Sequence, residues 1–326
     1  MADGWRHTAK PFAWRRSLWI AALLTPALLV MVLFVLWPLL SAFRFAFYEF
    51  NGLRPSGFIG LENFRQVLFE KPYSDWTWNA FKHNVIAFLA LMVFENGTAF
   101  LIAFALLKAL PGHRVHQVIV FLPVVLSAVI VGFLWKLFLH PLFGLVNQLL
   151  GLVGIGVIPW LGNENTALGS ILFANIWHWL GFPTLVLLAG MQRISKDVLE
   201  AARLDGAGDY ALMTNIVWPL IAPSVTIVTI LTFIGSFNWF EIPYVMAGLT
   251  GSPGGSTDVL GLYFYRTAFG STTTGIQDFG QGSALAVLMF IFVAGVTAIA
   301  LRYLRRREIE QREIAEKRKR QEQSSS

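Results

Sequence analysis

The apolar positions of this chain gather into six long runs, separated by polar segments that contain glycine and proline. A helix needs about 20 consecutive, mostly apolar residues to cross the hydrocarbon core of a bilayer. Small residues and prolines within the runs allow helices to pack closely or to kink, which favours a packed bundle over isolated anchors. We therefore predict six transmembrane helices, over Leu18–Phe43, Asn84–Leu107, Gln117–Leu139, Ala167–Met191, Ala222–Ala247 and Gly282–Leu304.

The composition supports a membrane protein. Of the 326 residues, 56% are hydrophobic and only 13% are charged, which points to a bilayer as the solvent. The first apolar run is too long for a signal peptide and has no clear small-residue cleavage site, so we count it as a span. The sequence has no cysteine, which excludes disulfides and thiolate metal sites.

The distribution of basic residues predicts the orientation of the spans. Lys and Arg are concentrated in the N-terminus, the Lys108–His116 turn, the loop of residues 191–221 and the C-terminal tail. Cytoplasmic segments carry the excess of Lys and Arg in membrane proteins, so we expect both termini and this loop to be cytoplasmic. The formal net charge of +6 reflects this asymmetry rather than nucleic-acid binding.

The chain is expected to form one membrane domain over residues 18–304. A short cytoplasmic N-terminus, residues 1–17, precedes it, and a charged cytoplasmic tail, residues 305–326, follows it. We interpret the tail as a solvated helical extension with a frayed end. The final polar run, Gln321–Ser326, is expected to be disordered.

Two external segments stand out between the spans. Arg44–Trp78 contains Gly, Pro and aromatic residues and is expected to form a short ordered cap. Gly248–Phe279 is rich in Gly, Ser and Thr, and its Ser252–Thr257 stretch has turn chemistry. This second segment is either a flexible connector or a contact for an external partner.

A polar helix with small residues lies between the fourth and fifth apolar runs, where an external protein could bind it. Several residue types occur in it at set spacings, and this pattern resembles the Glu-Ala-Ala loop of permease subunits of binding-protein-dependent ABC importers. These residues are Glu200, Ala201, Ala202, Gly206, Ile216 and Pro219. Other stretches resemble the sugar-importer branch of that family, namely Phe58–Phe64, Trp179–Pro183, Gly254–Thr257 and Tyr263–Phe269.

The resemblance covers roughly residues 18 to 305 and implies an all-α, six-helix bundle of the ABC type I importer permease kind. The loop departs from the family at Trp218, where leucine is common before the proline. The implied partners are a second permease subunit, usually non-identical, two ATPase subunits and an extracytoplasmic solute-binding protein. ATP and Mg²⁺ would be bound by the ATPase, because this sequence has no Gly-x-x-x-x-Gly-Lys-Ser/Thr loop. The chain is therefore not expected to be an enzyme or to hold a cofactor or metal.

The resemblance implies that the loop forms a short coupling helix seated in a groove of the ATPase. We expect Glu200 and Asp205 to be stabilised by the helix dipole near a helix start, or by basic groups of the partner. Ala201, Ala202 and Gly206 would give the low profile needed for close packing against another chain. The alternative interpretation is a plain cytoplasmic connector with ordinary capping.

The middle of each span marks the bilayer centre, because a helix rises by about 1.5 Å per residue. Polar and aromatic residues gather there in the fourth and fifth spans, where a sugar could meet aromatic faces, hydroxyls and amides. Irregular backbone at membrane depth is tolerated where it lines a cavity. The alternative role for these residues is helix packing with interhelical hydrogen bonds. The predicted path residues of these two spans are Trp179, Leu180, Gly181, Thr184, Ser236, Asn238 and Trp239.

Two carboxylates extend this predicted path. Glu95 lies at the centre of the second span, where an ionised side chain is costly and normally faces the bundle interior or water. Glu241 lies in the outer half of the fifth span. Either could bind hydroxyls of a polar solute or the amine of a cationic one, or could be a structural carboxyl. His178 is interpreted as a core histidine. No Lys or Arg occupies a span centre, which disfavours an anionic substrate unless the partner permease supplies the charge.

These features predict a permease subunit that imports a sugar or sugar derivative across the cytoplasmic membrane of a prokaryote. Within the same machine, the alternative cargo is a polyol, a glycerol-phosphate-type compound or a sugar acid. An ion-coupled secondary transporter with Glu95 as its ion site is an alternative of another class, but it should show two related halves, and no internal repeat is evident. A membrane scaffold without transport fits the number of spans but not the polar groups at their centres.

Overall fold

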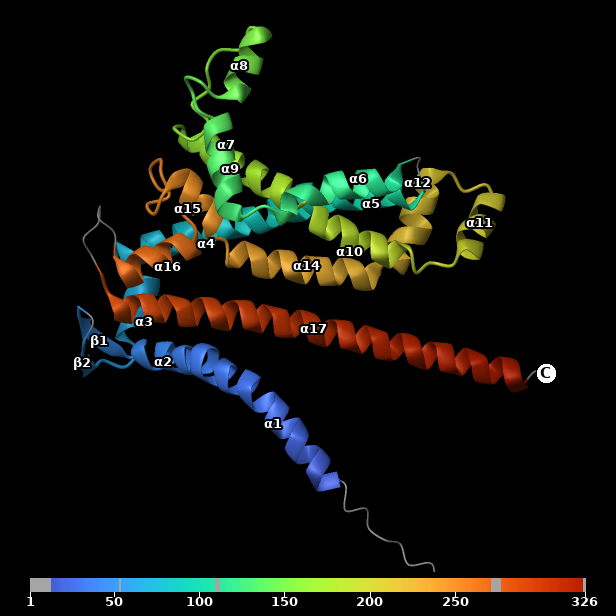
Figure 1. The fold of residues 1–326 in the computed structure, drawn as a ribbon, viewed down its shortest axis with the longest axis horizontal. Helices are drawn as coiled ribbons and strands as arrows, with labels where there is room; N and C mark the ends of the chain where they lie inside the picture. The colour runs from blue at the N-terminus through green and yellow to red at the C-terminus, as the bar shows by residue number, and fades with distance from the viewer. Residues whose placement is uncertain (1–12, 53, 109–111, 271–276, 325–326) are drawn as a thin grey trace, which may run out of the picture.

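A computed structural model describes residues 13–52, 54–108, 112–270 and 277–324. Most of the predicted N-terminal segment 1–17 lies outside the described residues. The described chain is almost entirely helical, with long helices running side by side along one axis (Figure 1). The only strands in these residues form a two-stranded hairpin, which the all-α expectation missed.

Three spans are continuous helices. The first joins α1 to α2 through a π-helical turn at Val32–Leu36, the second joins α4 to α5 through a π-helical turn at Leu91–Asn96, and the third is the start of α17. The elements of these spans are α1 Ala13–Met31, α2 Trp37–Phe45, α4 Tyr73–Ala90, α5 Gly97–Leu107 and α17 Phe279–Ser324.

The other spans are bent pairs of helices, and the number of spans reaches six when each pair counts as one. The bends measure 96° between α6 and α7, 46° between α9 and α10, and 74° at Ile221, before α14. The elements involved are α6 His113–Phe121, α7 Ala128–Phe138, α9 Glu164–Trp179, α10 Gly181–Met191, α12 Asp209–Ala211, α13 Trp218–Leu220 and α14 Ala222–Phe237.

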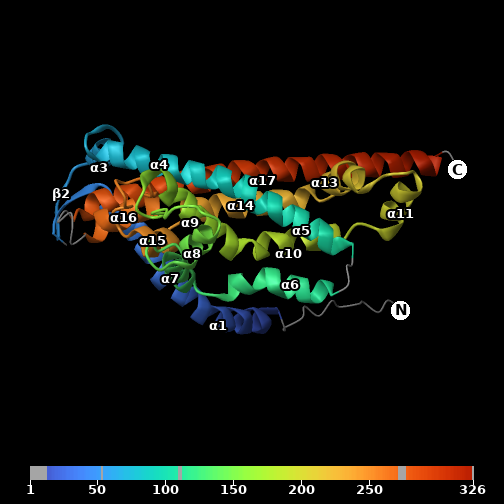
Figure 2. The same ribbon diagram turned by 90° about the horizontal axis from the view of Figure 1, so that it is seen from above.

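Shorter elements lie at the two ends of this bundle. Near one end lie the β1–β2 hairpin, α3 and α16, while α11, the start of α1 and the end of α17 lie toward the other (Figures 1 and 2). The short helix α8 projects away from the bundle beyond α7 (Figure 1). These elements are β1 Tyr48–Asn51, β2 Arg54–Phe58, α3 Glu62–Phe69, α8 Leu145–Leu152, α11 Lys196–Leu204, α15 Glu241–Ala247 and α16 Leu260–Phe269.

The predicted boundaries were wrong at the second and third spans. The second helix begins at Tyr73 rather than at Asn84, because its first turns bury the polar residues Ser74 and Thr77 at helical spacing. The third span is not one helix. Pro123 has no N–H for the helix ladder, and the extended backbone of Ser127 restarts the chain in a new direction.

The predicted fifth helix, Ala222–Ala247, is also wrong as a single element. Helix α14 ends at Phe237, the non-helical Phe240 follows, and α15 is a separate short helix. By contrast, the sixth span continues without a break into the charged tail as α17. That helix extends to Ser324, so the disorder predicted from Gln321 is wrong for the described part of the tail.

The cap predicted over Arg44–Trp78 is built on one buried asparagine. The side-chain amide of Asn63 donates to the carbonyl oxygens of Ala46 at 3.0 Å and Tyr48 at 2.9 Å, which joins α3 to the hairpin. Gly280 at the start of α17 lies so close that an added Cβ would be 2.5 Å from the Tyr48 carbonyl oxygen. The predicted ordered cap is therefore held directly against the sixth span.

A buried ion pair orders the segment that begins at Gly248. Nη1 and Nη2 of the Arg266 guanidinium donate to the carboxylate of Asp258, at 2.7 and 2.5 Å, and Nη1 also donates to the carbonyl oxygen of Leu249 at 3.1 Å. The amide of Asn79 on α4 donates to the carbonyl oxygen of Gly255 at 2.9 Å. The segment up to Gly270 is thus an ordered element packed on α4, not a flexible connector.

Removing one partner of this buried pair should destabilise the protein strongly. Asp258→Asn leaves the guanidinium buried without its counter-charge, and we expect a loss of about 3–5 kcal/mol. Thermal unfolding in nanodiscs, followed by tryptophan fluorescence, measures this loss. Glu62→Gln breaks the exposed pair of Glu62 with Arg65 and should leave the melting temperature unchanged. Equal effects of the two variants would contradict a structural role for the buried pair.

Candidate functional site

The predicted coupling loop folds into a separate exposed helix, α11, which lies at the end of the bundle (Figure 1). The hydroxyl of Ser195 caps its start by accepting a hydrogen bond from the backbone N–H of Asp197 at 3.2 Å. Leu199 and Ala202 turn inward and pack on the buried cluster formed by α5, α10 and the residues from Leu212 to Val228. The predicted loop residues Glu200 and Ala201 face outward and are exposed.

The end of α11 gives Gly206 a role that differs from the close packing predicted from the sequence. The Ala207 N–H donates to the Ala202 carbonyl at 2.9 Å, and the Gly206 N–H donates to the Arg203 carbonyl at 3.0 Å. This pattern is a Schellman motif, which requires left-handed backbone at the residue after the cap, and Gly206 has a φ of +84°. An added Cβ would meet nothing within 4 Å, so within this chain Gly206 provides a turn rather than a close approach.

The helix-dipole explanation for the two predicted acidic residues was wrong. Glu200 lies in the middle of α11 and Asp205 caps its C-terminus, whereas the acidic residue of the first turn is Asp197. A carboxylate at the C-terminal end is unfavourable to the dipole. The charges of Glu200 and Asp205 therefore contribute to the outward surface of the loop and not to the helix itself.

The rest of the loop returns to the bundle and is fixed there. Ile216 packs on the same buried cluster as α11, while Pro219 is exposed. Trp218, the departure from the family pattern, packs edge-to-face on Phe100 with ring centroids 5.0 Å apart. Lys108, at the end of α5, forms an ion pair with Asp209 at 2.6 Å, and this contact lowers the pKa of the Asp209 carboxyl.

The predicted substrate path is a cavity of about 450 Å³ between the second, fourth and fifth spans. Five of the nine predicted path residues line it: Glu95, Trp179, Asn238, Trp239 and Glu241. Glu95 belongs to the π-helical turn Leu91–Asn96, and such turns are frequent at functional sites. Asn238 and Trp239 lie in the break between α14 and α15, where the backbone leaves the helix.

The other four predicted path residues lie outside this cavity. Thr184 and Ser236 are buried, and each hydroxyl donates to a carbonyl oxygen of its own helix, at Leu180 and Thr232, 2.7 and 2.6 Å away. Leu180 is the hinge residue between α9 and α10. Gly181 permits close packing, because an added Cβ would lie 2.6 Å from the Val120 carbonyl oxygen on α6.

Two polar residues of the cavity were missed. Asn175 lies one helical turn before Trp179 on α9, so the i, i+4 spacing could have revealed it. Thr232 lines the cavity and receives a hydrogen bond from the Asn96 side-chain amide at 3.0 Å. No sequence spacing links Asn96 to Thr232, because Asn96 ends the π-helical turn of the second span and Thr232 is on α14.

Two buried polar atoms of cavity-lining residues have no hydrogen-bond partner among the described residues, Glu95 Oε2 and Trp239 Nε1. Buried polar groups are normally hydrogen-bonded, so each unpartnered one needs an explanation. One atom is an acceptor when the carboxyl is ionised and the other is a donor. A polyhydroxylated solute could satisfy both. His178, in contrast, does not line the cavity, and its Nε2 lies 3.0 Å from the Leu126 carbonyl oxygen at the bend of the third span.

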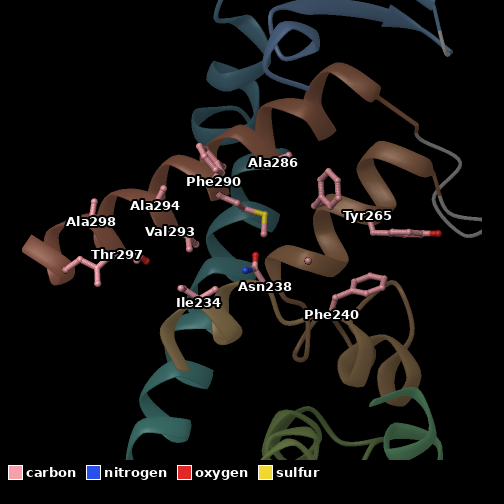
Figure 3. A pocket seen from close by; sticks show the side chains of 14 residues that line it. Ile234, Asn238, Phe240, Tyr265, Ala286, Phe290, Val293, Ala294, Thr297 and Ala298 are labelled. Atoms are coloured by element: carbon pink, nitrogen blue, oxygen red, sulfur yellow. The ribbon is translucent and has the colours of Figure 1, made fainter. Parts of the chain in front are cut away.

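A second, apolar cleft of about 700 Å³ adjoins this cavity along α14, α16 and α17. Figure 3 shows Asn238 and Ile234 facing it, with Phe290, Val293 and Ala294 of α17 across the cleft. Ile234 and Asn238 line both spaces. These two residues therefore belong to the walls of both the cavity and the apolar cleft.

Substitution at Gly206 should open the end of α11. Gly206→Ala forces a Cβ into left-handed backbone, at a cost of about 1–2 kcal/mol. Hydrogen exchange of the amides in residues 199–207 should then be roughly fivefold faster or more. Gly208 has ordinary extended backbone with a φ of −69° and open space around it, so Gly208→Ala is the matched control. Unchanged exchange in Gly206→Ala would refute the turn.

Polar residues inside and outside the cavity should differ in their effect on transport. Asn238→Ala and Trp239→Phe remove contacts that face the cavity and should lower uptake by roughly tenfold, because a lost hydrogen bond to a buried partner costs about 1–3 kcal/mol. Thr184→Ala and Ser236→Ala remove hydroxyls that bond only to their own helices and should leave uptake within about twofold. The measurement is initial uptake into vesicles at limiting substrate. The reverse order of effects would place the path elsewhere.

Comparison with known proteins places this architecture in a family, although no family model matches the sequence. The sulfoquinovosyl glycerol transport permease SmoG of Agrobacterium fabrum is 32% identical, with 88% of this chain and 90% of that protein covered. The trehalose/maltose transport permease MalF of Thermococcus litoralis is 31% identical, covering 86% and 91%. The sn-glycerol-3-phosphate permease UgpA of Pectobacterium atrosepticum is 29% identical, covering 90% and 96%.

Solved structures share the fold. A chain of a bacterial ABC transporter involved in the import of the acidic polysaccharide alginate superposes with a TM-score of 0.77 at 22% identity, covering 90% of this chain and 96% of that chain. A second structure of an alginate ABC transporter, in complex with an alginate pentasaccharide-bound periplasmic protein, gives 0.75. Membership of this group contradicts the alternative of an ion-coupled transporter built on Glu95. The chain belongs to the multi-pass permease subunits of ABC transport systems, whose members carry no ATPase activity of their own.

Proposed function

We propose that this chain forms half of the membrane path of an ATP-driven importer for a sugar or sugar derivative. The observation that carries the proposal is the cavity in which Trp179 and Trp239 lie with Asn175, Thr232 and Asn238. Aromatic faces suit the apolar CH patches of a sugar ring, and the amides and hydroxyl suit its hydroxyl groups. The names of SmoG and MalF, both of which refer to sugars or sugar derivatives, support the same class of cargo.

The proposed partner within the membrane is another permease subunit, most simply a non-identical one. Helix α1 and its continuation are almost wholly exposed, and the 18-residue window that defines the first span has 0% of its residues buried. The apolar cleft beside α17 is likewise open along the bundle. A lipid bilayer covers part of such surface, and a second subunit against the cleft would close the path at Ile234 and Asn238.

The ATPase is proposed to bind at α11. This helix exposes Val198 and Leu204 beside the charged Glu200 and Asp205, and Leu204 is 88% exposed. An apolar side chain surrounded by charges at the tip of a bundle is typical of a protein contact. ATP and Mg²⁺ belong to that partner, and each of two permease subunits would receive one ATPase subunit.

The proposed location is the cytoplasmic membrane of a prokaryote, with α11 and both termini in the cytoplasm. The excess of Lys and Arg in these segments supports this orientation. The β1–β2 hairpin and the Gly248–Gly270 segment then face outward, where a solute-binding protein can approach. The alginate transporter with its bound periplasmic protein supports such an arrangement by analogy of fold.

Closure of the ATPase pair is proposed to move α11 as a rigid lever. Leu199 and Ala202 join the lever to the cluster on α5 and α10, and the Lys108–Asp209 pair joins the returning loop to α5. Because α10 continues past Leu180 into α9, displacement of its cytoplasmic end is transmitted to the bend beside Trp179. The result is rocking of the spans between inward-facing and outward-facing states.

A charge placed on the tip of α11 tests the coupling role. Leu204→Glu changes an exposed side chain, so the chain should still fold, but it should lose co-purification of the ATPase and lower ATP-driven sugar uptake at least tenfold. Leu142→Glu is the matched control, because Leu142 is 85% exposed and lies in the segment between α7 and α8 rather than on α11. Retained ATPase binding and uptake in Leu204→Glu would place the contact elsewhere. Uptake of a sugar that continues without any ATPase would contradict the proposed function itself.

A further inference from the structure

Two carboxylates share the cavity, and no cation balances them. Glu95 and Glu241 both line it, while no Lys or Arg does among the residues that the structure describes. Glu95 is only 6% exposed, and its Oε2 has no partner in that part of the chain. The chain therefore contributes two carboxyl groups to this cavity, but no cationic side chain among the described residues that could neutralise an anion.

We infer that the cargo crosses in a form without net negative charge, and that Glu95 is a specificity-determining residue that rejects anionic sugars. The inference rests on the proposed function, because it concerns the substrate class of the same cavity. Family membership does not decide this point. One relative is named for sn-glycerol-3-phosphate, and the structural neighbour imports an acidic polysaccharide.

The physical reason is the cost of burying an unpaired anion. A sugar acid that enters a cavity at membrane depth loses hydration, and this loss is large unless a counter-charge or hydrogen bonds replace it. Glu241 adds direct repulsion at the rim, where it is exposed. The donors available to an anion are few: the side-chain amides of Asn175 and Asn238, the hydroxyl of Thr232 and the indole N–H of Trp239.

A neutral sugar does not carry this cost of burying an unpaired charge. Its hydroxyl groups can donate to the unpartnered oxygen of Glu95 and accept from the indole N–H of Trp239, so both orphaned groups gain partners. The cavity thus favours hydroxyl-rich, uncharged or cationic cargo over its carboxylated analogue.

The nearest alternatives for a cationic partner within this chain are already engaged. Arg266 is held by Asp258 in the external segment, and the ammonium of Lys136 on α7 donates to the carbonyl oxygen of Val245 at 3.3 Å. His178 has its Nε2 against the Leu126 carbonyl. None of the three lines the cavity. Any balancing cation would have to come from another subunit, and for that reason the test uses the assembled complex.

Direct binding to the complex of this chain with its partner permease and ATPases, in nanodiscs and without binding protein, tests the inference. Saturation-transfer NMR detects weak ligands and is run on three pairs of methyl glycosides: glucoside with glucuronide, galactoside with galacturonide, and mannoside with mannuronide. The two members of each pair differ only by a hydroxymethyl or a carboxylate at C6. We expect the neutral member of at least one pair to bind at least about tenfold more strongly than its anionic analogue.

Glu95→Gln keeps the shape of the side chain and removes its charge. It should raise the ratio of anionic to neutral binding at least threefold, and Glu241→Gln should shift the ratio in the same direction. Glu164→Gln is the control, because Glu164 lies outside the cavity at the start of α9, and it should leave the ratio unchanged. Gel filtration checks that each complex remains assembled.

The outcomes separate the two proposals. Equal binding of the anionic and neutral members by the native complex overturns the inference, and so does a ratio that neither Glu95→Gln nor Glu241→Gln changes. Parallel ATP-driven uptake into vesicles with the binding protein present reports on the proposed function. Equal uptake of neutral and anionic sugars would contradict the inference but not the proposed function. Absence of both binding and uptake for every sugar sinks the proposed function and the inference together.

Discussion

The hydrocarbon core of the bilayer offers no hydrogen bonds, and this constraint governs where the helices of this chain can break. Beside the break between α14 and α15, Asn84 on α4 satisfies one backbone group near the end of α14 and another at the start of α16. Its amide donates to the Ser236 carbonyl oxygen at 2.6 Å, and its side-chain oxygen accepts from the Leu260 N–H at 2.8 Å. One fully buried side chain thus joins α4, α14 and α16 at the point where the chain opens toward the cavity.

The same rule explains the bend of the third span. The Leu126 carbonyl lies at the turn from α6 to α7, and the ring of the buried His178 reaches it from α9. A second polar contact, from Asn96 to Thr232, joins the π-helical turn of the second span to α14. Both of these irregular points are therefore tied to another span by a side chain. The cavity lies among these points, so its shape depends on how the spans sit relative to one another.

This arrangement connects the two ends of the molecule. The cluster under α11 includes residues of α5 and α10, and both of these helices continue toward the cavity, α5 through the π-helical turn that holds Glu95 and α10 through the bend at Leu180. A displacement at the α11 end of the bundle reaches the cavity through two packed helices rather than through a single contact. The bends supply the positions at which such a displacement changes the lining instead of moving the bundle as a whole.

Hydropathy predicts the number of spans because length and apolar character decide whether a helix can cross a bilayer. It did not predict the bends, which depend on partners distant in sequence, such as Asn84 for Ser236. The predicted path residues fall into two groups, according to whether the side chain can find a hydrogen-bond partner within its own helix. Tryptophan and asparagine side chains in a break must face a space or a partner, and Trp239 and Asn238 line the cavity. Thr184 and Ser236 do not line it, because a buried hydroxyl can bond to its own helix four residues back.

For Gly206, the sequence shows the position in the loop but not the structural reason for a glycine there. Its place in the Glu-Ala-Ala loop is visible in the sequence, but the left-handed turn that ends α11 depends on backbone geometry. For Glu95, the sequence draws attention to the residue but does not show its surroundings. A single carboxylate at the centre of a span is conspicuous in the sequence, yet its meaning depends on what shares the cavity. Glu241 and the unpartnered indole of Trp239 line the same cavity, so this chain forms one wall that is acidic and aromatic. Ile234 and Asn238 belong both to this wall and to the apolar cleft, so the second permease subunit proposed to cover the cleft would meet the cavity wall at these residues.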